Sequence, residues 1–408
     1  MNNTTRNRII AEVAGSIDIP DSAYQKADAR YNDLGAWFGR KEARCHAFAP
    51  HIYPQGSFRL GTVISPVDAD GEYDLDMGCR LRVGVTKATH TQQQLKNLVG
   101  ADLEDYRVAR GIKEKKEEKH RCWRIKYADT LKFHLDTVPS IPETSERRRI
   151  IHEAIARTGT PADLALQVAN LAGAITDDRM RNYRIIDDAW RVSNSEGLAL
   201  WFESRMKLAK TLMEGLSIQA RAAKVDKLPA YRWKSPLQRC VQLLKRHRDI
   251  FFADDENGKP ASIIITTLSA MAYLGEAEIA DALETILPSM EGLVNPFSPR
   301  VPNPVNPAED FADKWSDPAS GRNNLEAKFR RWVRQARIDF EAIGKERKPE
   351  LVVEAARDKL GASLNAISLS TKLGIGLTGG LLLKPAAVPA GLSFPNKPLV
   401  PKNPAGFA

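Results

Sequence analysis

The stretch EYDLDMGCRLRV, residues 72–83, constrains the fold of this chain more than any other segment. Its apolar and polar residues nearly alternate, which predicts a strand. Because side chains alternate across a strand, Asp74 and Asp76 must point to the same side. Two carboxylates held side by side repel each other, and burying them unpaired is costly. The pattern therefore predicts a cationic group next to them.

A later strand carries a third carboxylate. The stretch RCWRIKYADTLKFHLDTVPS predicts a hairpin in which Lys132, His134 and Asp136 share one face of the second strand. Carboxylates that converge from two strands offer the hard oxygen ligands that Mg²⁺ prefers. We therefore expect Asp74, Asp76 and Asp136 to be catalytic and to bind two Mg²⁺ ions, for which Mn²⁺ is a substitute. Two such ions bridge a triphosphate and lower the pKa of an attacking hydroxyl.

A Gly-Ser pair precedes both strands, in the segment PQGSFRLGT. Gly56 permits close approach of the backbone to a ligand, and the hydroxyl of Ser57 can donate to a phosphate oxygen. Either feature alone is a weak signal. In the order Gly-Ser, Asp-x-Asp and a later single Asp, the features predict nucleotidyl transfer with pyrophosphate as the leaving group.

Composition restricts the setting of this chemistry. The 408 residues carry a formal net charge of +9, which suits a polyanionic partner such as nucleic acid or a nucleotide polyphosphate. The four cysteines form no CxxC pair and indicate reduced thiols. No signal peptide is recognisable, and the longest apolar stretch is too short to span a membrane. We predict a cytoplasmic protein with no membrane partner.

The order of the predicted elements is mixed α and β first, then mostly helix, which indicates an α+β protein. We predict a small mixed sheet with helices in residues 1–142, a mainly helical domain that closes the active-site cleft in 143–365, and a flexible tail in 366–408. Ser235 and Pro236 are expected to begin the clearest helix. The Pro-rich segment NPFSPRVPNPVNP is expected to form no regular element.

Three segments together resemble a known family. YPQGSFRLGT, EYDLDMG and FHLDTVP are similar to the active-site motifs of the CD-NTases, the cyclic-oligonucleotide-synthesising nucleotidyltransferases of bacterial antiphage defence, known as CBASS. Their spacing looks most like the cyclic GMP-AMP synthase branch. The resemblance covers roughly residues 53–334. It implies a polymerase-beta-like nucleotidyltransferase core in 1–142, with a C-terminal helical domain.

The resemblance also implies roles for single residues. Gln55, Gly56 and Ser57 would contact the triphosphate of the donor nucleotide. Lys245, on the helix that follows Ser235, and Ser262, which opens the helix SIIITTLSAMAY, would bind phosphates as well. The three aspartates keep the catalytic and metal-binding roles expected from the strands.

The function implied by the resemblance is synthesis of a cyclic dinucleotide, cyclic GMP-AMP or another, from ATP and GTP or other ribonucleoside triphosphates. In such systems the product switches on a downstream effector, and some relatives are joined through their C-terminal tail to other molecules by a conjugating partner. We expect no obligatory nucleic-acid activator, since the sequence has no cluster of zinc ligands like that of the DNA-sensing relative.

Two other readings stay open. A template-independent nucleotidyltransferase that makes a linear product, or modifies a protein, RNA or small molecule, would use the same carboxylates. A basic nucleic-acid-binding protein with an inactive core is the second alternative, although all three carboxylates are present. Arg124 and Lys126 are candidates for the acceptor nucleotide, and Glu309, Asp310 and Asp313 for a base edge.

Overall fold

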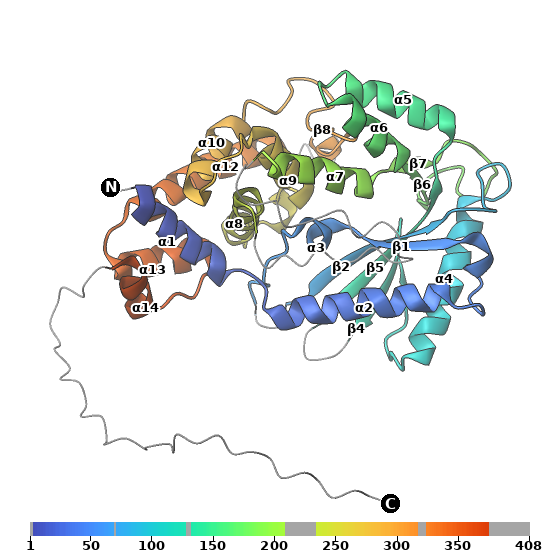
Figure 1. Ribbon diagram of the computed structural model, residues 1–408, viewed down its shortest axis with the longest axis horizontal. Helices are drawn as coiled ribbons and strands as arrows, with labels where there is room; N and C mark the ends of the chain where they lie inside the picture. The colour runs from blue at the N-terminus through green and yellow to red at the C-terminus, as the bar shows by residue number, and fades with distance from the viewer. Residues whose placement is uncertain (1–2, 69–70, 128–131, 209–233, 317–323, 375–408) are drawn as a thin grey trace, which may run out of the picture.

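The computed structural model describes residues 3–68, 71–127, 132–208, 234–316 and 324–374 (Figure 1). Two clusters of buried apolar side chains divide these residues into a sheet-containing part and a helical part. Figure 1 shows the sheet with helices α2 and α4 beside it, and most of the other helices across the sheet from them. The predicted α+β class, a mixed sheet followed by a helical region, is confirmed.

The main sheet has the strand order β1-β2-β5-β4-β3, and β6 and β7 extend it beyond β5. Strands β2 and β5 run parallel, while every other pair in this sheet is antiparallel. The strands are β1 (Pro50–Pro54), β2 (Tyr73–Leu81), β3 (Glu117–Glu118), β4 (Trp123–Tyr127), β5 (Phe133–Pro142), β6 (Gly173–Ile175) and β7 (Arg191–Ser193). The predicted hairpin is the β4–β5 pair, and its turn lies outside the described residues.

Alternation along β2 separates the core from the site. Leu75 and Met77 are fully buried and pack with α2 (Asp21–Gly39) and α4 (Gln92–Ala109) in one apolar cluster. The residues between them point to the opposite face, as expected for a pleated strand. Because one face of β2 is committed to the core, its carboxylates lie on the other face of the sheet.

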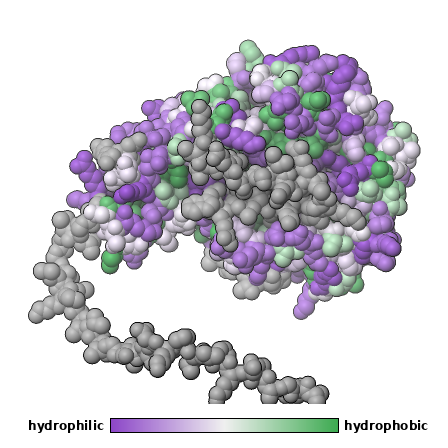
Figure 2. Space-filling model, in the orientation of Figure 1, coloured by the Kyte–Doolittle hydropathy of each residue, from purple (hydrophilic) through white to green (hydrophobic). Residues whose placement is uncertain are grey.

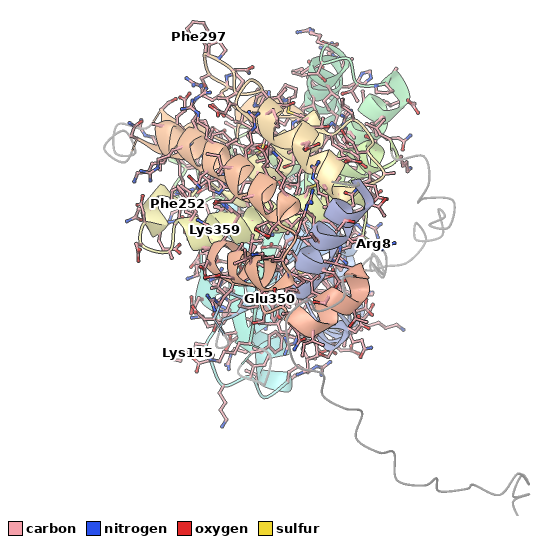
Figure 3. All side chains as sticks on the ribbon, turned by 90° about the vertical axis from the view of Figure 1, so that its left-hand side faces the viewer. Arg8, Lys115, Phe252, Phe297, Glu350 and Lys359 are labelled. Carbon is pink, nitrogen blue, oxygen red and sulfur yellow. The ribbon has the colours of Figure 1, made fainter. Side chains whose placement is uncertain are left out.

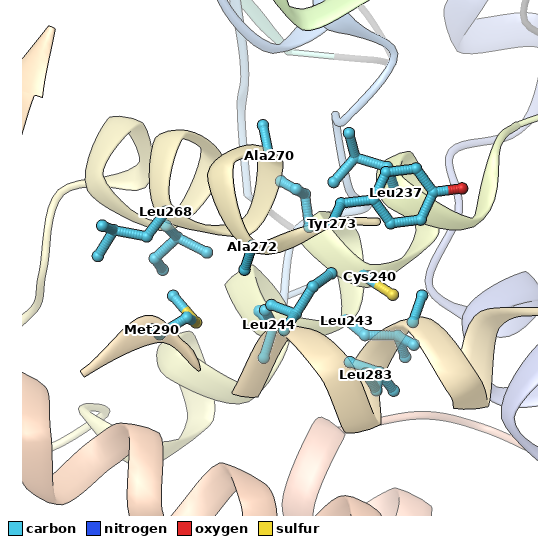
Figure 4. Packing of buried hydrophobic residues seen from close by; sticks show 14 of the residues in the cluster. Leu237, Cys240, Leu243, Leu244, Leu268, Ala270, Ala272, Tyr273, Leu283 and Met290 are labelled. Atoms are coloured by element: carbon cyan, nitrogen blue, oxygen red, sulfur yellow. The ribbon is translucent and has the colours of Figure 1, made fainter. Parts of the chain in front are cut away.

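The helical part forms the larger apolar cluster. Figure 4 shows Leu244, Leu268 and Leu283 meeting there from three different helices. Ser235 caps α8 in a capping box and Pro236 begins that helix, as predicted. The helices are α5 (Ser145–Ala156), α6 (Ala162–Asn170), α7 (Ser195–Met206), α8 (Pro236–Phe251), α9 (Ser262–Ala272), α10 (Ile279–Met290), α12 (Leu325–Lys345), α13 (Pro349–Leu360) and α14 (Ala366–Leu373).

The N-terminal helix α1 (Asn3–Ser16) belongs to the helical cluster. Its Ile9, Ile10 and Val13 are buried there, and Figure 1 shows α1 beside α13 and α14. The sequence predicted the N-terminal helices together with the sheet in residues 1–142, whereas the buried side chains of α1 and α2 belong to different apolar clusters. Helix α14 lies in the segment expected to be a flexible tail, of which residues 375–408 are outside the described residues.

The expectation of no regular element in the Pro-rich segment is wrong. A hairpin forms there from β8 (Pro302–Asn303) and β9 (Asn306–Asp310). Side chains supply hydrogen bonds that hold it: Asn303 Oδ1 accepts from the backbone N–H of Val305 at 3.0 Å. The Asp310 carboxylate accepts from three further backbone N–H groups. Such side-chain-to-backbone bonds stabilise a short hairpin that prolines cannot support through their own N–H groups.

The surface is mostly polar. In Figure 2 the coloured face is largely hydrophilic, with hydrophobic residues in small separate groups. Figure 3 shows the ring of Phe297 projecting from a loop at one end of the molecule, where it is 81% exposed. Of the described residues, no helix combines the length and apolarity needed to cross a bilayer.

Candidate active site

Two of the predicted carboxylates are direct neighbours across the parallel strands. Asp76 on β2 pairs in register with Asp136 on β5, and Asp74 pairs with His134 two positions earlier. All of these positions lie on one face of the sheet, since each is separated by two residues from the next along its strand. The structure therefore places the Asp-x-Asp motif and the later Asp on one surface, as the sequence predicted.

The Gly-Ser turn lies directly against Asp76. The backbone N–H of Gln55 donates to the carbonyl oxygen of Asp76 at 3.0 Å, and the hydroxyl of the buried Tyr31 donates to the same oxygen. Gly56 has φ +63°, and a Cβ there would lie 2.1 Å from Asp76 Oδ2. Only glycine fits this position, because both the backbone conformation and the space exclude a side chain.

Asp76 is the electrostatic centre of the group. Burial raises its pKa first of all, and the negative charges of Asp74 and Asp136 raise it further, to about 7. Arg124 and Lys245 act in the opposite direction. A carboxylate with a pKa near 7 is poorly compensated, and the imbalance indicates a place for additional positive charge.

The other two carboxylates already have partners. Arg124 Nε and Nη2 each donate to one oxygen of Asp136 at 2.7 Å. Asp74 is the most accessible, with 66% of its side chain exposed, and its Oδ1 lies 3.6 Å from His134 Nδ1. His134 Nε2 also lies 2.5 Å from the carboxylate of Glu72. In this arrangement positively charged or protonatable side chains partly neutralise the cluster.

The residues present fit Mg²⁺ by their chemistry. Three carboxylates on one face, one of them with a raised pKa, provide hard oxygen ligands and surplus negative charge. Within the described ranges, however, no group of three or more Asp, Glu, His or Cys side chains is already arranged around a metal position. Each oxygen of Asp136 instead accepts one hydrogen bond from Arg124 and keeps a further lone pair for another partner.

A serine that the sequence analysis did not single out holds Gln55. Ser195 Oγ, at the start of α7, donates to Gln55 Oε1 at 2.8 Å. This contact leaves the amide N–H₂ of Gln55 as the donor end of the side chain. Ser57 is the second residue of the short helix α3 (Gly56–Leu60), and its side chain is half-buried. No local pattern could reveal Ser195, because 140 residues separate it from Gln55.

The first turn of α7 is anchored to the sheet. Asn194 caps the helix by accepting from Gly197 N at 3.1 Å. Glu196 Oε2 lies 2.7 Å from Arg80 Nη1, and its other oxygen lies 3.3 Å from His51 Nε2. Since all three of these side chains are at most 13% exposed, the position of Ser195 is fixed relative to the strands.

Lys245 and Ser262 lie in a second polar group on the helical part. Lys245 Nζ donates to the carbonyl of Thr62 at 2.8 Å. Burial, and then the charge of Arg248, lower the pKa of Lys245 to about 8, while Asp76 and Asp74 raise it. Ser262 is the first residue of α9, and its Oγ accepts a hydrogen bond from Arg248 Nη1 at 2.8 Å.

The candidates for an acceptor nucleotide or a base edge fall in two places. Arg124 and Lys126 lie on the carboxylate face of β4, but Lys126 is paired with Glu117 at 2.5 Å. Glu309, Asp310 and Asp313 line a cavity of about 580 Å³ that includes none of the three aspartates.

Comparison with known proteins gives a match to part of the chain at the sequence level. Residues 50–139 match a family described as cyclic GMP-AMP synthase DncV-like, nucleotidyltransferase domain. The chain is 26% identical over 313 residues to a c-di-GMP synthase of Roseivirga ehrenbergii, covering 76% of this chain and 72% of that protein. It is 26% identical over 327 residues to the cyclic dinucleotide synthase CdnG of Bradyrhizobium diazoefficiens, covering 76% and 70%.

Solved structures share the fold. The Bradyrhizobium diazoefficiens CD-NTase CdnG, in complex with GTP, superposes with a TM-score of 0.60 at 20% identity, covering 90% of this chain and 98% of that one. CdnC of E. coli MS115-1, in its complex with HORMA-deltaN, gives a TM-score of 0.54 at 13% identity, covering 88% and 98%. At these identities the likeness concerns the arrangement of elements.

Proposed function

We propose that this chain, which carries a DncV-like nucleotidyltransferase domain in residues 50–139, is a cyclic dinucleotide synthase. The predicted resemblance to the CD-NTases and the predicted fold are confirmed by the match to the domain and by the shared architecture. The proposed reaction depends on the carboxylates of β2 and β5 and on the Gly-Ser turn beside them. The observation that carries the proposal is the contact of Gly56 with Asp76, beside Asp136 in register.

One set of residues is proposed to bind the phosphates of the donor nucleotide. In our proposal the backbone at Gly56 and the hydroxyl of Ser57 hold the donor triphosphate, and the amide of Gln55 adds a donor. Lys245 and Ser262 approach the phosphates from the helical part. The contacts that support this assignment are those of Lys245 Nζ with the carbonyl of Thr62, five residues after Ser57, and of Ser262 with Arg248 on the helix that carries Lys245.

Asp74, Asp76 and Asp136 would hold two Mg²⁺ ions. Bound there, the ions supply charge neutralisation for the triphosphate and a lowered pKa for the acceptor hydroxyl. Asp136 is proposed to help accept the proton of that hydroxyl, through a lone pair that Arg124 does not use or that it releases. Arg124 is then available to the acceptor nucleotide, the role expected for it from the sequence.

Two observations, the names of the relatives and the spacing of the motifs, support a proposal for the bases of the product. One relative is named a c-di-GMP synthase, and the solved CdnG structure contains GTP, so we propose GTP as one substrate. The spacing of the motifs resembles the cyclic GMP-AMP synthase branch, which makes ATP the second candidate. The product is then cyclic di-GMP or cyclic GMP-AMP.

Product analysis tests the proposal. The purified chain is incubated with Mg²⁺ and GTP, ATP or both, treated with phosphatase, and analysed by mass spectrometry. A phosphatase-resistant cyclic dinucleotide from GTP alone supports cyclic di-GMP, and one that requires both triphosphates supports cyclic GMP-AMP. A ladder of linear products, or label transferred to another acceptor, would contradict cyclisation. Asp74→Ala should abolish the product while leaving the circular dichroism spectrum unchanged.

We further propose a role in antiphage signalling, based on the family resemblance. The cyclic product would activate a downstream effector, and the C-terminal tail, of which residues 375–408 lie outside the described residues, would be the site of conjugation to a partner. Phage plating on cells that carry the chain with its neighbouring genes tests this role. Protection that survives Asp136→Ala would contradict signalling by the product.

A further inference from the structure

Arg248, in the last turn of α8, has a buried guanidinium that contacts the start of α9. Its Nη1 donates to the carbonyl oxygen of Pro260 at 3.0 Å and to Oγ of Ser262 at 2.8 Å. Figure 1 shows α8 and α9 beside each other, and residues of the two helices are in contact. One guanidinium nitrogen thus holds both the backbone that leads into α9 and the first side chain of that helix.

Asp249 holds the same guanidinium from the other side. Its Oδ1 accepts from Nε and Nη2 of Arg248, at 3.0 and 2.7 Å, and Lys259 Nζ lies 2.9 Å from that oxygen. An arginine has five N–H groups, one on Nε and two on each Nη. In these contacts Nε uses one, Nη1 uses two and Nη2 uses one, so a single N–H is left. Arg248 is therefore bound by the protein itself and is poorly suited to bind a phosphate directly.

The contact with Arg248 leaves the hydroxyl of Ser262 as a donor. A serine hydroxyl has one O–H donor and two acceptor lone pairs, and Arg248 occupies a lone pair. Within the described ranges Ser262 Oγ donates no hydrogen bond, and it does not cap α9, because the residue before that helix is Ala261. The side chain is half-buried, so a ligand can reach its O–H group. Ser262 thus offers a proton to an acceptor such as a phosphate oxygen.

Lys245 lies on the same side of α8 as Arg248, since residues three positions apart in a helix are neighbours. Burial lowers the pKa of Lys245, and the charge of Arg248 lowers it further. Lys245 Nζ donates to the carbonyl oxygen of Thr62, five residues after Ser57. The two phosphate ligands proposed for the helical part, Lys245 and Ser262, are therefore both neighbours of Arg248.

We propose that Arg248 is a positioning residue for the donor triphosphate and acts through the hydroxyl of Ser262. The inference rests on the proposed function, in which Ser262 binds a phosphate of the donor nucleotide. Because Arg248 donates to Ser262 Oγ, the O–H of Ser262 is directed away from the guanidinium. The hydroxyl is also a stronger donor, since hydrogen bonds in a chain polarise one another. Arg248 itself does not touch the nucleotide.

Binding of ligands with and without phosphates tests the inference in the absence of turnover. The affinities for nonhydrolysable GTP with Mg²⁺ and for guanosine are measured by calorimetry or, for the weaker ligand, by ligand-detected NMR. Ser262→Ala and Arg248→Gln should each weaken binding of the GTP analogue about tenfold, the effect of losing a hydrogen bond to a charged group. Neither should change the affinity for guanosine. The double variant should also lose only about tenfold, because both substitutions act through one hydroxyl.

Two further variants separate positioning from charge and from folding. Arg248→Lys keeps the positive charge but lacks the planar fork that holds Pro260, Ser262 and Asp249 together, so it should restore only part of the lost affinity. The double-variant cycle is repeated with Arg248→Lys, which replaces Arg248→Gln if the latter does not fold. The matched control is Thr266→Val. Thr266 Oγ1 donates to the carbonyl oxygen of Ser262 at 2.9 Å, so this variant removes a contact with the same residue but not with its hydroxyl, and both affinities should equal those of the wild type.

Four results would overturn the inference. Equal losses for the GTP analogue and guanosine in Arg248→Gln would mean that the arginine only supports the fold. A loss of about a hundredfold in the double variant would mean that Arg248 acts independently of Ser262. Full affinity in Arg248→Lys would mean that charge alone is sufficient, and unchanged binding in Ser262→Ala would remove the contact that Arg248 is proposed to position. A wild-type chain that shows the expected binding differences but forms no dinucleotide would refute the proposed function instead.

Discussion

Asp76 shows how a single residue carries both the chemistry and a cost in stability. In the folded protein burial and its two acidic neighbours raise its pKa to about 7, compared with 3.8 for an ordinary aspartate. The folded chain therefore binds a proton more tightly than the unfolded chain between these values. It follows that the contribution of Asp76 to the free energy of unfolding of the metal-free protein falls as pH rises from about 4 to about 7.

Asp76→Asn should remove this pH dependence. We expect the metal-free variant to be about 1–3 kcal/mol more stable than the wild type at pH 8 and equally stable near pH 3, where Asp76 is protonated in both states. Urea unfolding in EDTA measures the difference, with the exposed Asp254→Asn as the control. A stability difference between Asp76→Asn and the wild type that does not grow between pH 4 and pH 7 would show that burial and the neighbouring carboxylates do not raise the pKa of Asp76.

Gly56 tests the proximity of the phosphate turn to Asp76. Gly56→Ala should reduce synthesis at least a hundredfold, because the new Cβ would overlap Asp76 Oδ2 and displace either the turn or the carboxylate. Gly111→Ala is the matched control, since Gly111 has the same φ of +63° but no atom within 4 Å of the added Cβ. Both variants therefore have the same backbone strain, but only Gly56→Ala also places a Cβ against Asp76 Oδ2. If Gly56→Ala and Gly111→Ala formed the dinucleotide at equal rates, the Gly-Ser turn would not lie against Asp76 as described.

At the scale of elements, local patterns were sufficient for much of the site. The alternation in residues 72–83 predicts β2 and the side on which its carboxylates lie, because a buried face leaves only one choice. The capping residues predict the start of α8. Strands β6 and β7 have three residues each and no period that a sequence can show, since their pairing partners are distant.

Contacts between elements were beyond the reach of the sequence. Lys245 was placed by resemblance, but the sequence could not show that Arg124 engages Asp136 or that Ser195 holds Gln55. Each of these contacts depends on how strands and helices pack, so its signal is spread over residues far apart in the chain. The start of α8 could be predicted, whereas the contacts of its polar residues could not.

Helix α7 should control the affinity for the donor nucleotide through Ser195. Ser195→Ala removes the hydrogen bond to Gln55 Oε1, which is worth about 1 kcal/mol. We expect KM for the donor to rise about fivefold with a smaller change in kcat, and Ser195→Thr to restore part of the loss. Ser204→Ala on the same helix is the control, because its hydroxyl donates to the carbonyl of Trp201 within α7. An unchanged KM would mean that Gln55 does not depend on α7.

On the scale of the whole molecule, the two apolar clusters are joined by polar contacts. Gln238, Gln242 and Lys245 lie at successive turns of α8 and donate to the carbonyls of Leu60, Val63 and Thr62. The chain that follows the phosphate turn is thus fastened to the helical part by backbone groups. Such an interface fixes the two parts in position without a continuous apolar core, which suits a site assembled from both.

Helix α1 gives the test of this organisation, because it is early in the chain and yet belongs to the helical cluster. The sequence could not show which part of the molecule covers the apolar residues of this helix. Ile9→Ala should lower the free energy of unfolding by about 2–4 kcal/mol, since Ile9 is 0% exposed and its truncation leaves a cavity. Ile367→Ala, at a side chain that is 63% exposed on α14, should change it by less than about 0.5 kcal/mol.

The region that Ile9→Ala destabilises first shows whether α1 belongs to the helical cluster or to the sheet. If α1 is part of the helical cluster, hydrogen exchange in Ile9→Ala should accelerate in α10 and α12, which pack on α1, before it accelerates in β2 and β5. The sheet keeps its own core with α2 and α4, so its amides should remain protected until the global transition. Faster exchange that begins in the sheet would instead join α1 to the domain in which the sequence placed it.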